Sequence, residues 1–239
     1  MYFDIDPTEL YQILSDKFGR LKWWPTDRKY HKKNGTDPRF EIIIGAILTQ
    51  NTAWSNVERA LKNLKNENIL NLDEIVECND EKLKELIRPS GFFNQKAKRV
   101  KNISEFFKEK YSGDLDSFFN KEPLELRKQL LNLKGIGPET TDSILLYAGE
   151  KPIFVVDAYT KRICKRLPVE SKDSYKEIQK YFQKKFIKNY NHSDLVEVYQ
   201  QVHALIVELC KNYCRKKPKC NGCPLREKCR FYLSKQKKI

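Results

Sequence analysis

Two glycines separated by one isoleucine, Gly135-Ile136-Gly137, constrain the fold of this 239-residue chain more than any other feature. Leucines at roughly helical spacing predict a helix over Leu124–Leu133, directly ahead of the glycines. A second helix is expected over Glu139–Tyr147, and Pro138 stands at its first position, where proline is favoured. The glycines therefore predict a tight hairpin between two helices.

Such a hairpin can bind an anion. Glycines let the backbone approach a ligand closely, and the N–H groups at the start of the second helix can donate to a phosphate oxygen. An ordinary helix–turn–helix without a ligand has the same local pattern. From these residues alone, phosphate binding and a plain turn both stay open.

A carboxylate follows the hairpin at Asp157, directly after the apolar run Ile153–Val156. It can be the N-cap of a helix predicted over Ala158–Arg166, since aspartate is a preferred capping residue. It can equally be a buried acid with a chemical role. The two interpretations are compatible, because a capping carboxylate can still face a ligand.

Four of the seven cysteines fall near the end of the chain, as Cys214-x5-Cys220-x2-Cys223-x5-Cys229. This clustering predicts a metal site. Disulfides fit less well, because the chain shows no secretory signal and cytosolic thiols stay reduced. The spacing leaves a four-thiolate zinc site and an iron–sulfur cluster both open. The basic residues 215–219 would form a loop pinned between two ligands, which suits contact with phosphate.

Charge and length narrow the class of partner. The formal net charge is +14, from 46 basic and 32 acidic residues, which attracts polyanions and makes their binding salt-dependent. A lysine-rich surface of a thermophile would have the same balance. No apolar run approaches the length that spans a membrane. We therefore expect a cytoplasmic, nucleoid-associated protein that binds nucleic acid and no membrane.

The rest of the chain predicts one all-helical body, formed by one or two lobes. Glycine and proline are few, and no repeat, low-complexity linker or long strand-like alternation occurs. Besides the hairpin helices and Ala158–Arg166, the expected helices are Pro7–Phe18, Phe40–Thr49, Ala53–Leu64, Leu72–Cys78, Asp80–Ile87, Asn94–Tyr111, Ser174–Phe186 and Asp194–Leu209, with Arg88–Gly91 as a short loop.

Two further segments can touch a ligand. Gln50 lies in a polar turn after an apolar helix, where it is either a wedge or part of a cap before the next helix. Trp23-Trp24-Pro25 is either packing between lobes or an aromatic slot. An indole face attracts a cation by about 0.5–2 kcal/mol, so such a slot would favour a positively charged base.

Taken together, Gly-Ile-Gly followed by Val-Asp-Ala-Tyr resembles the helix-hairpin-helix DNA glycosylases of the endonuclease III superfamily. The resemblance implies an all-α, two-lobed fold. One lobe would be a six-helix unit over residues 38–152, with the hairpin at about 124–148. Residues 1–37 and 153–239 would form the second lobe, with an iron–sulfur loop at 214–229. In this family the matching acid, here Asp157, is the catalytic carboxylate.

The resemblance also gives the cysteines a cofactor. Many relatives hold a four-iron–four-sulfur cluster in a C-terminal loop, which implies Cys214, Cys220, Cys223 and Cys229 as ligands and leaves zinc as the alternative. Their commonest first gap is six residues rather than five, so Cys210 is an alternative first ligand. The lone Cys78 and Cys164 are expected to be small buried residues.

Arg88–Arg99, with the sequence RPSGFFNQKAKR, is similar to the 3-methyladenine glycosylase branch of this superfamily, as are the Trp-Trp-Pro segment and the Leu-Thr-Gln-Asn-Thr turn. The resemblance implies that Gln50 fills the gap left by a flipped-out nucleotide, since extruding a base costs a few kcal/mol. It assigns DNA binding to Gly135, Ile136 and Gly137. The base pocket would be formed by Trp23, Trp24, Pro25 and Trp54. The four-cysteine loop departs from that branch.

Glu139 is a second departure, because bifunctional relatives have a lysine at this position. A carboxylate cannot form the Schiff base that a lysine amine forms with C1′ of the sugar. The expected activity is therefore monofunctional removal of a damaged base, such as 3-methyladenine, from double-stranded DNA by a monomer. Asp157 would be the main catalytic group, and Glu139 either assists it or interacts with the positive end of the helix dipole.

Three alternatives remain. A bifunctional glycosylase/lyase for oxidised pyrimidines would need an amine from Lys134, Lys151 or Lys161. A non-catalytic protein would bind damaged DNA and release nothing. A zinc-stapled RNA-binding module is the third.

Overall fold

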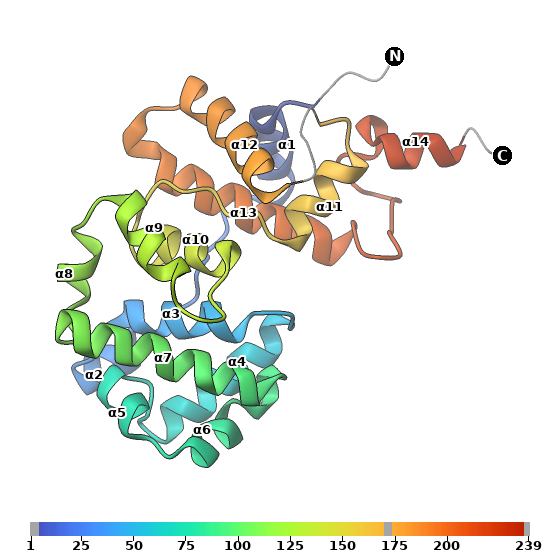
Figure 1. Cartoon of the computed structure of the whole chain (residues 1–239). Helices are drawn as coiled ribbons and strands as arrows, with labels where there is room; N and C mark the ends of the chain where they lie inside the picture. Colours follow the sequence, from blue (N-terminus) through green and yellow to red (C-terminus); the bar gives the residue numbers. More distant parts are fainter. Residues whose placement is uncertain (1–4, 170–173, 237–239) are drawn as a thin grey trace. The chain divides into compact units, whose positions relative to one another are not determined.

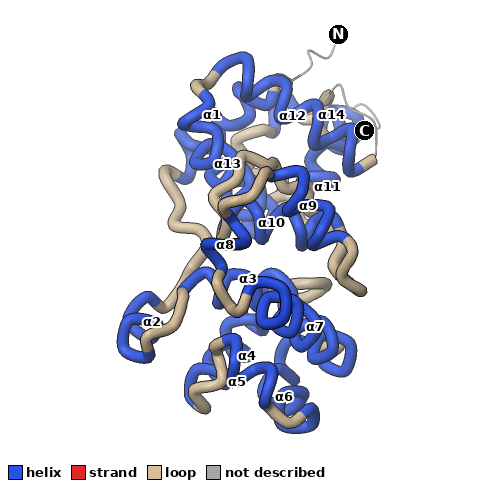
Figure 2. The backbone as a smooth tube through the Cα atoms, turned by 60° about the vertical axis from the view of Figure 1, so that its left-hand side comes forward, coloured by secondary structure: helices blue, strands red, loops and turns tan. Residues whose placement is uncertain are grey.

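A computed structural model of the chain describes residues 5–169 and 174–236, and within these ranges it contains helices and loops but no strands (Figure 2). The all-α fold class predicted from the sequence is therefore confirmed. The chain divides into two compact units. The first combines Met1–Trp23 with Pro152–Ile239, and the second is Trp24–Lys151.

The second unit is built around one central helix. Its elements in chain order are α2 (Arg28–Asn34), α3 (Pro38–Leu48), α4 (Trp54–Asn66), α5 (Leu72–Glu77), α6 (Asp80–Ile87), the 3-10 turn η1 (Arg88–Ser90), α7 (Phe93–Tyr111), α8 (Leu115–Phe119), α9 (Pro123–Leu131) and α10 (Pro138–Tyr147) (Figure 1). All residues of α3 from Phe40 to Leu48 are buried, as expected for a helix that is apolar on every side. Helices α4, α7 and α10 pack against it.

The first unit is assembled from both ends of the chain. It contains α1 (Pro7–Phe18), α11 (Ala158–Arg166), α12 (Tyr175–Asn189), the 3-10 turn η2 (His192–Asp194), α13 (Leu195–Asn212), the 3-10 turn η3 (Arg226–Lys228) and α14 (Arg230–Gln236) (Figure 1). Helix α13 packs against α1, α11 and α12. The rings of Phe154 and Phe182 stack with centroids 4.7 Å apart, and Tyr199 meets Phe154 edge-on.

The predicted helices are confirmed, with small differences at their ends. Three of them, α1, α6 and α11, have the expected bounds. The sequence analysis missed α2, α8 and α14, which have seven, five and seven residues. Helices this short carry too few apolar positions to show a periodic pattern. The expected loop at residues 88–91 is the turn η1 followed by Gly91.

The second unit begins at Trp24, earlier than the boundary expected at residue 38. A buried contact between a histidine and a carboxylate explains why α2 belongs to it. His31 Nε2 lies 3.0 Å from Glu41 Oε2 on α3, and both side chains are almost fully buried. Lys65 on α4 donates to the other oxygen of Glu41 at 3.0 Å. Three helices therefore meet at one carboxylate.

No helix within the described ranges is both long and apolar enough to cross a membrane.

Candidate functional site

The hairpin between α9 and α10 has the geometry that its glycines predict. Gly135 has a φ of +86°, a left-handed conformation that favours glycine, and it is exposed. Ile136 is 5% exposed and anchors the turn, while Gly137 is the N-cap of α10. The backbone thus turns sharply on an apolar anchor and leaves the start of α10 accessible.

An ion pair fixes the two hairpin helices to each other. Arg127 on α9 donates from Nε to Asp142 Oδ1 on α10 at 2.7 Å and from Nη2 to Oδ2 at 3.1 Å. Asp142 is completely buried. Because a bidentate guanidinium–carboxylate pair restricts orientation, it holds the hairpin in a defined shape.

Gln50 lies against this hairpin. It follows the C-terminus of α3, and its Nε2 donates to Thr140 Oγ1 at 2.9 Å and to the carbonyl of Gly135 at 3.2 Å. Its Oε1 accepts a hydrogen bond from Arg99 Nη1 on α7. Both ends of the Gln50 amide are therefore oriented by the protein.

Arg99 and Lys96, two residues of the Arg88–Arg99 segment, connect α7 to the hairpin and to the end of α3. The sequence analysis did not assign either a role. Arg99 crosses Gly135 so closely that an added Cβ there would lie 2.9 Å from Arg99 Cδ. Lys96 is completely buried, and its ammonium donates to the carbonyls of Leu48 at 2.8 Å and Ser90 at 2.7 Å. Burial, with Arg99 nearby, lowers the pKa of Lys96 to about 8.

Asp157 is both a helix cap and a buried acid. Its Oδ1 accepts from the backbone N of Thr160 at 2.7 Å and from its hydroxyl at 2.8 Å, so the predicted N-cap of α11 is confirmed. Its Oδ2 lies 3.7 Å from His203 Nε2 on α13. Asp157 is 7% exposed.

The surroundings keep Asp157 ionised despite its burial. Burial raises the pKa of Asp157, but His203 and the two donors of Thr160 outweigh it, so the pKa lies below the ordinary value of 3.8. Nothing in the local sequence pointed to His203, which comes from a helix more than forty residues later in the chain.

Glu139 lies in the first turn of α10 and is exposed. An acid in the first turn of a helix interacts favourably with the positive end of the helix dipole. This placement accounts for Glu139 without a catalytic role.

The predicted aromatic pocket is divided between the two units. Trp24 belongs to the second unit, where its ring lies 5.3 Å from Trp54 and 5.3 Å from Tyr147. A Cβ added at Gly45 of α3 would lie 3.1 Å from Trp24 Nε1, so the indole packs directly on that glycine. Trp23 belongs to the first unit, where Lys211 Nζ lies 5.6 Å from its ring.

A hollow of about 330 Å³ in the second unit is lined by Pro25 and Trp54. Its other lining residues are Thr26, Asp27, Glu41, Glu58, Leu61 and Lys65. Three carboxylates against one lysine give this hollow an acidic character. An aromatic wall beside carboxylates suits a flat ligand with positive charge.

All four cysteines of the C-terminal group line one small hollow in the first unit. The ring of Tyr213 and that of Phe231 also line it. Cys210 does not line it and lies buried at the end of α13. Among the described residues, no three His, Cys, Asp or Glu side chains are grouped closely enough to hold a single metal ion.

Helix α11 holds the first of these cysteines. Arg166 Nη1 donates to Cys214 Sγ at 3.2 Å, and Arg162 Nη1 donates to the Cys214 carbonyl at 3.0 Å. A hydrogen bond from Cys210, together with Arg166, lowers the pKa of Cys214 below its ordinary value in spite of burial. A lowered pKa favours the thiolate, which is the form that binds metal.

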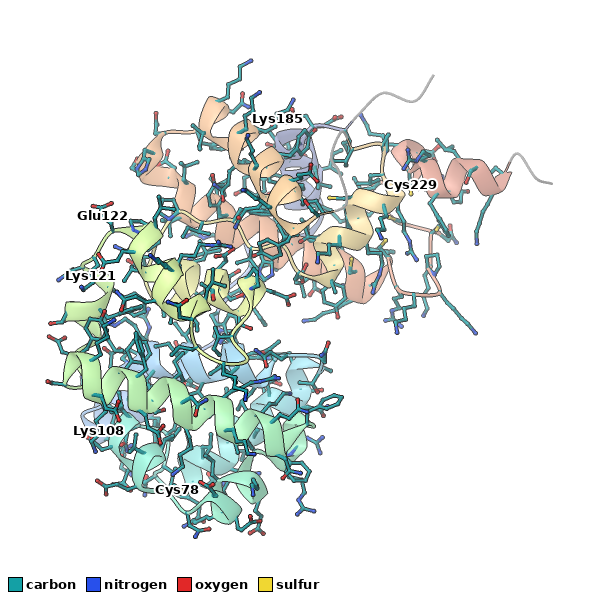
Figure 3. The ribbon with its side chains drawn as sticks, viewed as in Figure 1. Cys78, Lys108, Lys121, Glu122, Lys185 and Cys229 are labelled. Atoms are coloured by element: carbon teal, nitrogen blue, oxygen red, sulfur yellow. The ribbon has the colours of Figure 1, made fainter. Side chains whose placement is uncertain are left out.

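Figure 3 labels Cys229, which precedes α14, and Cys78, which follows α5. Cys164 is buried, as predicted. The expectation that Cys78 is buried is wrong: it is partly exposed, because it caps the C-terminus of the short α5, and its thiol donates to the carbonyl of Asn79.

The helix-hairpin-helix, the all-α fold and the capped, buried Asp157 are the features that the resemblance to helix-hairpin-helix DNA glycosylases predicts. Residues 44–188 match the family described as HhH-GPD superfamily base excision DNA repair protein. The chain belongs to this superfamily, and it is a base excision repair DNA glycosylase of the endonuclease III type.

Individual relatives agree with this assignment. A putative DNA repair glycosylase of Methanocaldococcus jannaschii is 47% identical over 223 residues, covering 92% of this chain and 94% of the relative. Endonuclease III of Thermotoga maritima is 30% identical, covering 87% of this chain and 88% of the relative.

Solved structures show the same fold. The H. pylori 3-methyladenine DNA glycosylase bound to 1,N6-ethenoadenine has a TM-score of 0.71 and 32% identity, covering 87% of this chain and 98% of that one. A non-covalent endonuclease III–DNA complex has a TM-score of 0.75 and 19% identity, covering 98% of this chain and 99% of that one.

Proposed function

We propose that this chain is a monofunctional DNA glycosylase that removes N-alkylated purines, such as 3-methyladenine, from double-stranded DNA. The observation that carries the proposal is the environment of Asp157, a buried carboxylate kept ionised by Thr160 and His203. A group of this kind can stabilise positive charge, and hydrolysis of an N-glycosidic bond develops positive charge on the sugar.

The choice of substrate rests on two observations. The 32% identity with the H. pylori 3-methyladenine glycosylase supports an alkylated purine. The hollow beside Trp54 and Pro25, with Asp27, Glu41 and Glu58 in its lining, suits a flat cationic base. A base that already carries positive charge is a good leaving group, so it needs little help from a second acid.

In the proposed reaction, the hairpin backbone and the start of α10 bind a phosphate, and Gln50 fills the space of the extruded nucleotide. The carboxylate of Asp157 stabilises the sugar as the bond to the base breaks. It also orients the water that attacks C1′ and accepts its proton. The proton then leaves to solvent with the free base and an abasic site as products.

Glu139 supports hydrolysis without strand cleavage. It occupies the hairpin position from which a lysine amine would attack C1′, and a carboxylate cannot form a Schiff base. The abasic site would therefore remain intact on the enzyme.

We also propose that Cys214, Cys220, Cys223 and Cys229 hold a four-iron–four-sulfur cluster. The four cysteines line one hollow, and among the described residues no three thiols converge closely enough to hold a single ion, which fits a group larger than one zinc ion. When bound, the cluster would supply structure by cross-linking residues 214–229. The basic residues between the first two cysteines would then be displayed toward DNA.

The test is base release from a methylated duplex, measured by chromatography, with strand nicking assayed before and after alkali. We expect free 3-methyladenine, and nicks only after alkali. Nicks before alkali, together with an adduct trapped by borohydride, would show that another lysine supplies a lyase activity. Tight binding to damaged DNA with no release of any alkylated, oxidised or deaminated base would show a non-catalytic binder.

A further inference from the structure

We infer that Arg99 is a DNA-positioning residue with two partners: it orients Gln50, and it contacts the DNA phosphate bound at the hairpin. The inference deepens the proposed function, because it rests on the hairpin as the phosphate site. It concerns how the protein recognises a gap in the duplex, and it does not depend on which base is removed.

The first partner is defined by hydrogen bonds. Arg99 Nη1 donates to Gln50 Oε1, while Gln50 Nε2 donates to Thr140 and to the Gly135 carbonyl. A carboxamide can be turned so that its oxygen and nitrogen exchange places. The guanidinium allows one of these orientations only, because it has donors and no acceptor. Arg99 thereby decides which end of the Gln50 amide faces the hairpin.

The second partner is indicated by the position of the Arg99 side chain. Its Cγ and Cδ would each lie 2.9 Å from a Cβ at Gly135, so the chain of methylenes crosses the hairpin glycine itself. Arg99 is partly exposed, and its Nη2 makes a long contact of 3.4 Å to Gln95 Oε1. The guanidinium is therefore held at the turn that would receive a phosphate.

The charges around Arg99 favour an anion as this second partner. Buried Lys96 adds a second cation nearby, and the charge of Arg99 contributes to the lowered pKa of Lys96. The partners that the structure records for the Arg99 guanidinium are the neutral amides of Gln50 and Gln95. Hydrogen bonds from arginine to phosphate are roughly twice as strong as those between neutral groups, and they match the planar guanidinium. An arriving phosphate is thus a better partner than those amides.

The experiment measures binding to a duplex that contains a tetrahydrofuran abasic-site analogue, at several salt concentrations. Four proteins are compared: wild type, Arg99→Ala, Gln50→Ala and the double variant. The duplex has no base to release, so the result is independent of the substrate proposed above.

We expect Arg99→Ala to reduce the slope of log K against log salt by about 1, in the wild-type and the Gln50→Ala background alike, because one phosphate contact is lost. We also expect Arg99→Ala to weaken binding about tenfold more in the wild type than in Gln50→Ala, since the two residues act together. An unchanged slope, or a slope change that disappears in Gln50→Ala, would overturn the phosphate contact. Equal losses in both backgrounds would overturn the orienting role.

Two further variants separate the roles. Arg99→Lys keeps the charge but lacks the guanidinium fork, so it should retain the salt slope and lose the coupling to Gln50. Lys110→Ala removes a charge near the other end of α7, about 16 Å away along the helix, and should leave the slope unchanged. If Lys110→Ala reduced the slope as much as Arg99→Ala, net charge alone would explain the result and the inference would be wrong. Should Arg99→Ala fail to fold, Arg99→Gln provides a neutral side chain of similar reach.

Discussion

At the scale of single residues, Asp157 shows how one side chain can serve the helix and the chemistry together. Its Oδ1 satisfies the donors of Thr160 at the start of α11, and its Oδ2 faces His203. The capping bonds fix the rotamer of the carboxylate, and the same bonds favour its charged form. The same hydrogen bonds therefore fix the position of the Asp157 carboxylate and favour its ionised form.

Asp157→Asn is expected to abolish most base release while leaving the fold and DNA binding intact. Asparagine is also a preferred N-cap, so its side-chain oxygen can still accept from Thr160. The lost negative charge should slow base release by roughly 100-fold or more. Single-turnover release and duplex affinity are measured in parallel, and a variant that turns over like the wild type would remove Asp157 from its role.

The ionisation of Asp157 also predicts a pH dependence. Its pKa is lowered in the folded protein, so the carboxylate contributes stability above the unfolded value near 3.8, and this contribution is lost as pH falls through the folded pKa. Activity should persist in acid for the same reason. In His203→Gln, which removes the imidazole that lowers the pKa of Asp157, the acid limb of the rate profile should move to higher pH. The same acid limb in both proteins would contradict this.

At the scale of elements, the hairpin depends on glycine at one position more than at the other. Gly135 has a positive φ, and the Arg99 side chain packs directly against it. Gly137 has an ordinary φ of −95°, and a Cβ added there would have nothing within 4 Å. The two glycines look equivalent in the sequence. Only the backbone conformation distinguishes them.

Gly135→Ala should therefore destabilise the protein by about 1–2 kcal/mol, the cost of placing a Cβ in the left-handed region, plus the displacement of Arg99. Gly137→Ala is the matched control and should cost less. Thermal unfolding of both variants measures the difference. Equal melting temperatures would show that the hairpin turn relaxes freely.

The cysteine loop gives the second prediction at this scale. In Cys223→Ser, we expect the purified protein to lose its brown colour and its bound iron, because one of four thiolates of the proposed cluster is missing. Cys78→Ser should change neither, since Cys78 lies at the end of α5 in the other unit. Iron analysis and visible absorption measure whether each variant retains iron. Zinc in place of iron in the wild type would refute the cluster.

At the scale of the whole molecule, the first unit is formed by two separate segments of the chain. Contacts between these two segments must therefore hold the unit together. Gln201 on α13 provides one: Leu21 N–H donates to Gln201 Oε1 at 3.0 Å, and Gln201 Nε2 donates to the Leu21 carbonyl at 2.8 Å. The Gln201 amide pairs with the Leu21 backbone as one peptide group pairs with another, and it joins two segments 180 residues apart in the chain.

Gln201→Leu should leave both backbone groups of Leu21 without these partners. The cost is about 2 kcal/mol for these two partly buried polar groups, or a fall of about 4–8 °C in the melting temperature. Gln12→Leu, on the exposed side of α1, is the control and should have little effect. A melting temperature for Gln201→Leu equal to that of the control would show that apolar packing alone joins the two segments.

Much of the fold could be predicted because it depends on local signals. Long amphipathic helices, Pro138 at the start of α10 and Asp157 at the start of α11 are all encoded within a few residues. Helices α2 and α8 could not be predicted, because they are short and α2 is held by the buried Glu41 of α3. Cys78 was misplaced for a related reason, since its exposure depends on where α5 ends.

The sequence by itself determined the helical class, the hairpin, the capped aspartate and the grouping of four cysteines, because each depends on neighbouring residues and on spacing. The tertiary structure alone decided that His203 faces Asp157, that Arg99 crosses Gly135 and orients Gln50, and that Trp23 and Trp24 belong to different units. The contacts of His203 with Asp157 and of Arg99 with Gly135 and Gln50 join residues far apart in the chain, whereas Trp23 and Trp24 are sequence neighbours assigned to different units. They depend on how whole helices pack, and no local pattern records that.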